Sequence, residues 1–143
     1  MAAATLVLVV TATLGGCADS TEPSIHDAYV IAPAGSTATM YFTITNPTPQ
    51  SVSLTAVSTP LSDRVEMHTE TQSDGLMSMS PVTAIAVDAK GSVTLDPGGS
   101  HVMLLDVASL TTGARVSTTF TFSNGHTETI SVPVRSGAFG ASG

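Results

Sequence analysis

The chain has 143 residues, which is enough for one domain with a hydrophobic core and does not suggest two domains. Its 4 Lys and Arg residues against 11 Asp and Glu residues give a formal net charge of −7. This balance argues against the basic surface that nucleic acids require, so we expect no nucleic-acid partner and a surface that tolerates cations.

The N-terminal segment is an apolar run that ends at Gly15-Gly16. It is shorter than the roughly 20 residues of a membrane-spanning helix, and it predicts a secretory signal peptide over residues 1–16. Leu14-Gly15-Gly16-Cys17 resembles the bacterial lipobox, in which the cysteine becomes the lipidated first residue of the mature protein. We therefore expect an exported protein that a lipid on Cys17 anchors to the extracytoplasmic face of a membrane, in the periplasm or cell envelope. The alternative is a core strand that contains a cysteine.

The rest of the chain divides into a tether, one domain and a tail. Cys17 is the only cysteine, so a lipidated protein has neither a disulfide nor a free thiol, and its fold depends on packing alone. Residues 17–25 lack apolar periodicity and predict a flexible tether, and residues 136–143 predict a flexible tail. The folded domain is expected over residues 26–135.

The domain sequence is typical of an all-β protein. Val, Thr and Ile occur in short runs that Pro, Gly and Asn separate, and no convincing amphipathic helix is present. Strands are predicted near residues 27–32, 38–45, 52–58, 64–71, 76–80, 92–95, 101–106, 115–123 and 127–134. About eight to nine short strands in roughly 110 residues predict a sandwich of two sheets. Asn124-Gly125 is expected to close the last hairpin.

A second hairpin is predicted around Asp74-Gly75, which is a strong signal for a two-residue turn. This turn sets the cross-strand pairs Ser73 with Leu76, Gln72 with Met77, Glu70 with Met79 and His68 with Pro81. His68 and Met79 then become diagonal neighbours on one face, within reach of long side chains. Met67 points to the opposite face, into the core.

A second pair of similar residues follows a Pro-Gly-Gly turn. His101 and Met103 are two positions apart in a predicted strand, so their side chains share one face. Brought together with His68 and Met79, they would form a site of two imidazoles and two thioethers. Thioethers are soft, uncharged donors that select Cu(I), and imidazole also accepts copper. The sequence therefore predicts a Cu(I) site of His68, Met79, His101 and Met103, in which Met77 could replace Met79 if the hairpin register shifts.

The remaining candidate ligands are expected to have lesser roles. Met67 and Met77 are interpreted as packing or outer residues of the site, and His26 and His126 as solvated side chains with a minor capacity for Cu(II). Glu66 and Glu70 flank His68 and are interpreted as solvated charges, because carboxylates are hard donors that suit Cu(I) poorly.

The spacing of the four ligands resembles that of the periplasmic copper chaperones called PCu(A)C. Ten residues separate His68 from Met79, twenty-one separate Met79 from His101, and one separates His101 from Met103. The segments 65–68, 75–82, 97–104 and 120–125 are also similar to that family, and the resemblance covers roughly residues 27–134. It implies a cupredoxin-like β-sandwich or barrel that binds Cu(I) outside the cytoplasm. It further implies delivery of copper to the CuA centre of cytochrome c oxidase, directly or through a Sco-type chaperone, and hence a role in oxidase assembly.

Other functional classes fit the sequence less well. A blue-copper protein needs a cysteine thiolate, and the mature domain contains none. We found no hydrolase motif, and a zinc enzyme would favour His, Cys or carboxylate ligands over thioethers, so the protein is not expected to be an enzyme. A carrier for copper storage or resistance, and a structural or interaction lipoprotein without metal, remain as alternatives.

Overall fold

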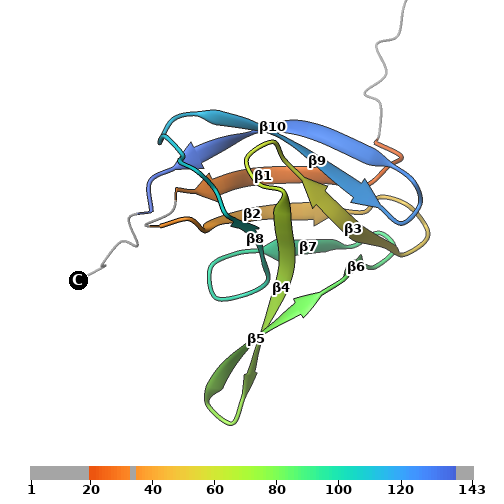
Figure 1. Ribbon diagram of the computed structural model, residues 1–143. Helices are drawn as coiled ribbons and strands as arrows, with labels where there is room; N and C mark the ends of the chain where they lie inside the picture. The colour runs from red at the N-terminus through yellow and green to blue at the C-terminus, as the bar shows by residue number, and fades with distance from the viewer. Residues whose placement is uncertain (1–19, 33–34, 138–143) are drawn as a thin grey trace, which may run out of the picture.

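The computed structural model describes residues 20–32 and 35–137 (Figure 1). The predicted signal peptide, Cys17 and most of the predicted tail lie outside the described residues. The described part contains ten strands, and the all-β prediction is confirmed. The strands are β1 (Ser24–Ile31), β2 (Ala38–Thr45), β3 (Val52–Ser58), β4 (Arg64–Ser73), β5 (Leu76–Val82), β6 (Ile85–Val87), β7 (Ser92–Leu95), β8 (His101–Leu105), β9 (Arg115–Phe122) and β10 (Thr127–Arg135).

The strands form one continuous mixed sheet that folds over on itself. Its order is β5-β4-β8-β2-β1-β10-β9-β3-β6, and β7 pairs with β2 beside this path. The pairs are antiparallel except for β1 and β10, which run parallel at Val30↔Val134 and Ile31↔Arg135. This parallel pair joins the half that carries β2, β4, β5 and β8 to the half that carries β3, β6 and β9.

The hydrophobic core lies between the two halves. Alternate residues of each strand point inward, as in the burial pattern of β9, where every second residue is buried. Phe42 of β2 meets Phe120 of β9 edge to face, with ring centroids 5.0 Å apart, and both side chains are fully buried. Aromatic pairs of this geometry add to the stabilisation from burial, so this contact fixes one half against the other.

β7 and β8 share one edge of β2. β7 pairs with β2 residues 42–45 and β8 pairs with β2 residues 38–40, so the loop between them leaves and rejoins this edge beside Tyr41. The loop is thereby held close to the point where β8 begins, at His101.

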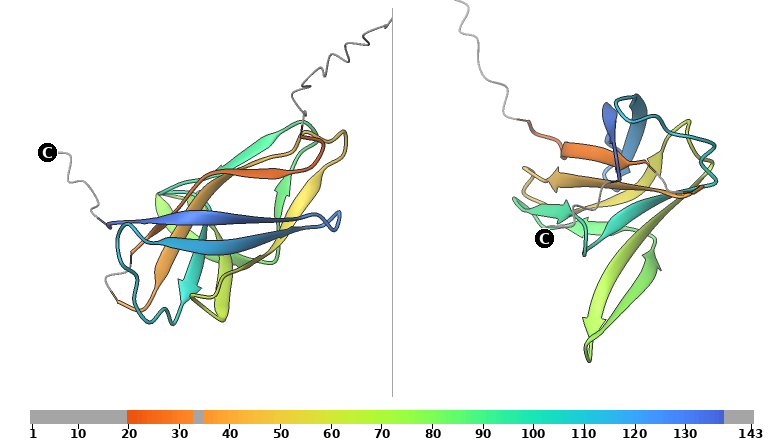
Figure 2. Two further views of the ribbon diagram at one scale, coloured as in Figure 1. Left: turned by 90° about the horizontal axis from the view of Figure 1, so that it is seen from above. Right: turned by 90° about the vertical axis from the view of Figure 1, so that its left-hand side faces the viewer.

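β4 and β5 form a long hairpin that projects from the body of the domain (Figure 1; Figure 2, right). Its register is the one predicted from the Asp74-Gly75 turn, with Glu70↔Met79 and His68↔Pro81. Asp74 and Gly75 both have positive φ, 53° and 77°, as a two-residue hairpin turn requires. Within residues 20–32 and 35–137, no helix is long and apolar enough to cross a bilayer.

β1 begins at Ser24, earlier than the strand predicted near 27 and two residues before the expected start of the domain. Ile25 is buried in the core, and the pairing with β2 shifts between His26 and Tyr29. Asp27 lies at this bulge with a φ of 53°. The bulge breaks the alternation of buried and exposed residues, and for this reason the sequence pattern showed only the second half of β1.

Candidate metal site

The predicted ligands lie on the outer face of the sheet, over β5, β4 and β8. Their strand neighbours Met67, Val102 and Leu104 point the opposite way and are buried in the core. Because side chains alternate along a strand, residues 66, 68 and 70 of β4 share the outer face with 101 and 103 of β8. The prediction that Met67 is a core residue is confirmed.

His68 and His101 are direct cross-strand partners. The β4–β8 register pairs His68 with His101, and the two rings stack with centroids 5.6 Å apart at an interplanar angle of 16°. His101 is almost fully buried, at 6% exposure, whereas the His68 side chain keeps 13% of its surface accessible. The fold therefore brings together two imidazoles that 32 intervening residues separate in the sequence.

The two thioethers flank this pair on the same outer face. Met103 pairs with Glu66 and Met79 pairs with Glu70, so both methionines are diagonal neighbours of His68, one from β8 and one from β5. Such diagonal positions are within reach of long side chains. Met103 is half-buried, whereas Met79 is 53% exposed. Met77 pairs with Gln72, one step further towards the hairpin turn, so the register favours Met79 over Met77.

A tight turn before β8 fixes the orientation of His101. The Gly99 N–H donates to the Asp96 carbonyl at 3.0 Å, and Gly98 has a φ of 91°, so residues 96–99 form a β-turn with Pro97 and Gly98 at its centre. Pro followed by Gly at these positions is the sequence preference of a type II turn. The turn aims the Gly99 carbonyl at His101 Nδ1, 3.1 Å away.

Tyr41 forms one wall of the site. Its ring lies 6.4 Å from the His101 ring and 5.4 Å from that of Tyr29, and Arg135 stacks over Tyr29 at 4.2 Å. Burial raises the pKa of Tyr41 above its usual 10.0, and the charges of Tyr29, Glu70 and Asp96 raise it further. The aromatic side chains thus cover the side of His101 that faces β2 and β1.

The two glutamates beside His68 are not simply solvated, and here the interpretation from the sequence is wrong. Glu66 Oε2 is 3.0 Å from His68 Nε2, and both side chains are partly buried. Glu70 Oε2 is buried and has no hydrogen-bond partner within the described structure. A signal for these contacts was present, because residues two positions before and after a histidine in a strand share its face.

The other two histidines lie away from this pair. His26 is exposed on β1 and its Nε2 is 3.0 Å from Ser24 Oγ. His126 follows the β9–β10 turn, stacks on Phe122 at 6.0 Å, and has its Nδ1 3.9 Å from Glu22 Oε2. In the described ranges, no group of three or more His, Cys, Asp or Glu side chains is arranged to hold a metal ion.

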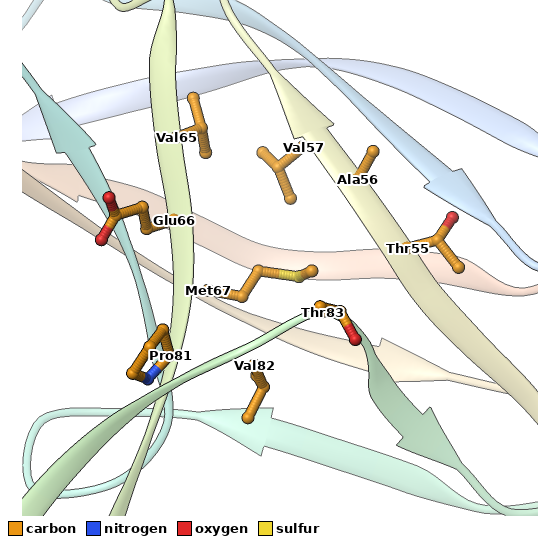
Figure 3. Close-up of a pocket in the computed structure, with 9 residues that line it drawn as sticks. All are labelled: Thr55, Ala56, Val57, Val65, Glu66, Met67, Pro81, Val82 and Thr83. Atoms are coloured by element: carbon orange, nitrogen blue, oxygen red, sulfur yellow. The ribbon is translucent and has the colours of Figure 1, made fainter.

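A pocket of 410 Å³ opens on the opposite side of β4, between β3 and the end of β5 (Figure 3). Val57, Val65 and Met67 point into this region. Glu66 also lines the pocket, but the carboxylate end of its side chain points to the other side of β4. None of the four predicted ligands lines the pocket, so the pocket and the candidate site are separate features.

Comparison with protein families and curated sequences links the chain to lipoproteins. Residues 23–134 match the family described as "Putative lipoprotein LpqE-like". A curated protein of Leifsonia xyli subsp. xyli (strain CTCB07), described as "Putative lipoprotein Lxx21020", is 33% identical over 73 residues. That alignment covers 50% of this chain and 44% of the relative, so the match spans less than half of the relative's length.

Comparison with solved structures links the fold to PCuAC domains. The copper-bound PCuAC domain from PmoF2 superposes with a TM-score of 0.69 at 24% identity, over 80% of this chain and 93% of that domain. DR1885 from Deinococcus radiodurans is similar in its apo form, with a TM-score of 0.63 at 27% identity over 96% of this chain and 95% of DR1885. Its Cu(I) form has the same TM-score at 28% identity, over 80% of this chain and 77% of DR1885. These matches confirm the resemblance to PCu(A)C domains that the sequence indicated.

Proposed function

The chain belongs to the LpqE-like lipoprotein family, and on this premise we propose that it is an extracytoplasmic copper chaperone that binds Cu(I) and passes it to another protein. The proposed ligands are His68, Met79, His101 and Met103. The single observation that carries the proposal is the stacked cross-strand pair of His68 and His101 on the outer face of the sheet, with a methionine diagonal to His68 on each side.

The donor set suits Cu(I) and a carrier function. Two neutral imidazoles and two thioethers leave the charge of Cu(I) unchanged, and soft sulfur donors favour the reduced ion. Thioethers also avoid the disulfide chemistry that would consume thiolates outside the cytosol. Because Met79 is half-exposed and lies on the projecting hairpin, one ligand of the site is accessible to a partner that receives the ion.

Similar proteins support this assignment. DR1885, which is 28% identical to this chain, has been solved with Cu(I), and the PCuAC domain from PmoF2, which shares the fold, has been solved with copper. The lipoprotein family and the lipobox-like sequence ending at Cys17 support export and anchoring by a lipid. The proposed recipient is the CuA centre of cytochrome c oxidase, reached directly or through a Sco-type chaperone.

The test is a competition titration of the full-length chain with Cu(I) and a chromophoric chelator, under reducing and anaerobic conditions. We expect the wild type to remove one equivalent of Cu(I) from the chelator and His101→Ala to lose this capacity. His26→Ala is the matched control, because its imidazole is exposed on β1 and lies outside the site. Failure of the wild type to compete would refute the proposal and favour a structural lipoprotein without metal.

The recipient is tested separately. The Cu(I)-loaded chain is mixed with an apo CuA domain and an electron acceptor, and formation of the CuA absorption bands is followed. Transfer is expected to be faster than from an equal concentration of chelator-bound Cu(I). Retention of all the copper by a chain that binds it well would favour storage or resistance over delivery.

A further inference from the structure

Each imidazole of the candidate site has one nitrogen next to an oxygen that can only accept a hydrogen bond. His68 Nε2 lies 3.0 Å from Glu66 Oε2, and His101 Nδ1 lies 3.1 Å from the Gly99 carbonyl oxygen. An ionised carboxylate and a backbone carbonyl have no proton to donate, so each of these nitrogens must carry the hydrogen. In a neutral imidazole the other nitrogen then holds the free lone pair. That nitrogen is Nδ1 in His68 and Nε2 in His101.

Burial singles out the same atom of His68. Its Nδ1 is buried and has no hydrogen-bond partner within the described structure. A buried acceptor without a partner destabilises the folded chain, and coordination of a metal ion would remove that penalty. The tautomer identifies Nδ1 as the nitrogen with the free lone pair, and the lack of a partner shows that no other protein group uses it.

We propose that His68 binds copper through Nδ1 and His101 through Nε2, and that Glu66 is the positioning residue that holds His68 in the required tautomer. This inference rests on the proposed copper function. Glu66 can take this role because it lies two residues before His68 on β4 and therefore on the same face. A carboxylate that accepts from the distal N–H of a metal-binding imidazole fixes the ring and raises its basicity.

The two histidines are held by different means. The backbone holds His101, because its acceptor is the carbonyl of Gly99 in the turn before β8, whereas a side chain holds His68. A single substitution at Glu66 can therefore release one ring and leave the other in place. The near-parallel stacking of the rings, at 16°, means that rotation of His68 away from Glu66 also changes its contact with His101.

Long-range ¹H–¹⁵N NMR of the imidazoles tests the proposal, because ¹⁵N shifts distinguish protonated, free and metal-bound nitrogens and because Cu(I) is diamagnetic. In the apo full-length chain we expect the hydrogen on Nε2 of His68 and on Nδ1 of His101. On addition of Cu(I), the ¹⁵N signals of His68 Nδ1 and His101 Nε2 should move as the ligating nitrogens. In Glu66→Ala, His68 should populate the other tautomer and the Cu(I) affinity should fall by about tenfold or more.

Two further variants separate positioning from charge. Glu66→Gln keeps an amide oxygen that can accept from Nε2, so it should retain the His68 tautomer and most of the affinity. Asp74→Asn removes one negative charge from the turn of the same hairpin without touching His68, and Asn tolerates the positive φ at this position. It should leave both the tautomer and the affinity unchanged.

The outcomes that overturn the inference are distinct from those that overturn the proposed function. A Cu(I)-dependent shift at His68 Nε2 in place of Nδ1, or an unchanged tautomer and affinity in Glu66→Ala, would refute the inference and leave copper binding intact. A wild type in which no histidine nitrogen responds to Cu(I) would refute the ligation and the proposed function together. The tautomers of apo wild type and apo Glu66→Ala would still show whether Glu66 positions His68.

Discussion

His68 is the residue on which the other candidate ligands converge. It pairs with His101, lies diagonal to Met79 and Met103, and contacts Glu66. Its position in the middle of β4, between β5 and β8, explains this, because a strand with neighbours on both edges can receive side chains from both.

The thioethers can be tested one at a time. We expect Met79→Leu and Met103→Leu each to lower the Cu(I) affinity by about tenfold or more, equivalent to about 1.4 kcal/mol per tenfold. The fold should remain intact, because Leu and Met have similar volumes. Chelator competition gives the affinity and circular dichroism monitors the fold. Met77→Leu is the control, since Met77 is about as exposed as Met79 but lies two residue pairs further from His68 along the hairpin. Equal Cu(I) affinities for the wild type and the three variants would show that the thioethers are not ligands.

Tyr41 gives a prediction for alkaline pH. Its pKa is raised by burial first and then by the charges of Tyr29, Glu70 and Asp96. As the pH rises, the unfolded chain therefore loses this proton before the folded chain does, and above about pH 10 the free energy of unfolding falls. In urea unfolding of the apo protein, the free energy of unfolding of Tyr41→Phe should fall less between about pH 8 and about pH 11 than that of the wild type. Parallel declines in the two proteins would show that Tyr41 is not the cause.

For individual residues, the sequence identified the candidate ligands more completely than the residues that surround them in the fold. Two local signals indicated the ligands: a His and a Met two positions apart in a strand, and the Asp74-Gly75 turn. The β4–β5 hairpin has the register predicted from that turn. The contact of Glu66 with His68 is equally local, but the donor type of a carboxylate gives no indication of it. The Tyr41 wall depends on the pairing of β2 with β8 and on the loop between β7 and β8, and no local pattern encodes such pairing.

Among the secondary-structure elements, the β4–β5 hairpin controls the position of Met79. Its turn requires positive φ at two consecutive residues, and Gly75 provides 77° without strain. A Cβ at Gly75 would meet nothing within 4 Å, so the effect of substitution comes from the backbone alone.

We therefore expect Gly75→Ala to destabilise the hairpin by about 1–2 kcal/mol. Amide hydrogen exchange should become faster in residues 71–79, and the Cu(I) affinity should fall because Met79 is less well placed. Gly35→Ala is the matched control, since it also has open space around it and its φ is not in the left-handed region. Unchanged exchange in the hairpin would indicate that the turn does not determine its stability.

One strand, β6, was not predicted from the sequence, because its local pattern is weak. β6 spans only Ile85–Val87, which is too short for alternation to be recognised, and it forms by pairing with β3.

The β9–β10 turn also differs in detail from the prediction. Four residues, 123–126, separate the two strands, and of Asn124 and Gly125 only Gly125 has positive φ, at 86°.

For the whole molecule, the core and the site lie on opposite faces of the same half of the sheet. Phe120→Ala removes the edge-to-face contact with Phe42 and should lower the free energy of unfolding by about 3–5 kcal/mol. The folded fraction should keep its Cu(I) affinity, because Phe120 lies on β9, in the half that carries no candidate ligand. Urea unfolding and chelator competition measure the two quantities. The control Leu76→Ala, at a side chain 73% exposed on the hairpin, should change stability by about 0.5 kcal/mol or less.

The sandwich of two packed halves was predictable from the many short β-rich runs, of which some, such as β9, alternate clearly, but the order of the strands was not. The parallel pairing of β1 with β10 joins segments from the two ends of the domain. Such pairing depends on which edges remain free after the hairpins have formed, and composition and periodicity do not specify this.

The start of β1 and the tip of the β4–β5 hairpin lie at opposite ends of the domain (Figure 1; Figure 2, right). With a lipid on Cys17, the seven steps to Ser24 span at most about 25 Å of extended chain, so the end of the domain that carries β1 stays near the bilayer. The tip of the hairpin, at the other end of the domain, can then extend away from the lipid surface. If the protein carries copper as proposed, a recipient must expose its own metal centre within reach of a domain that this short tether holds to the membrane.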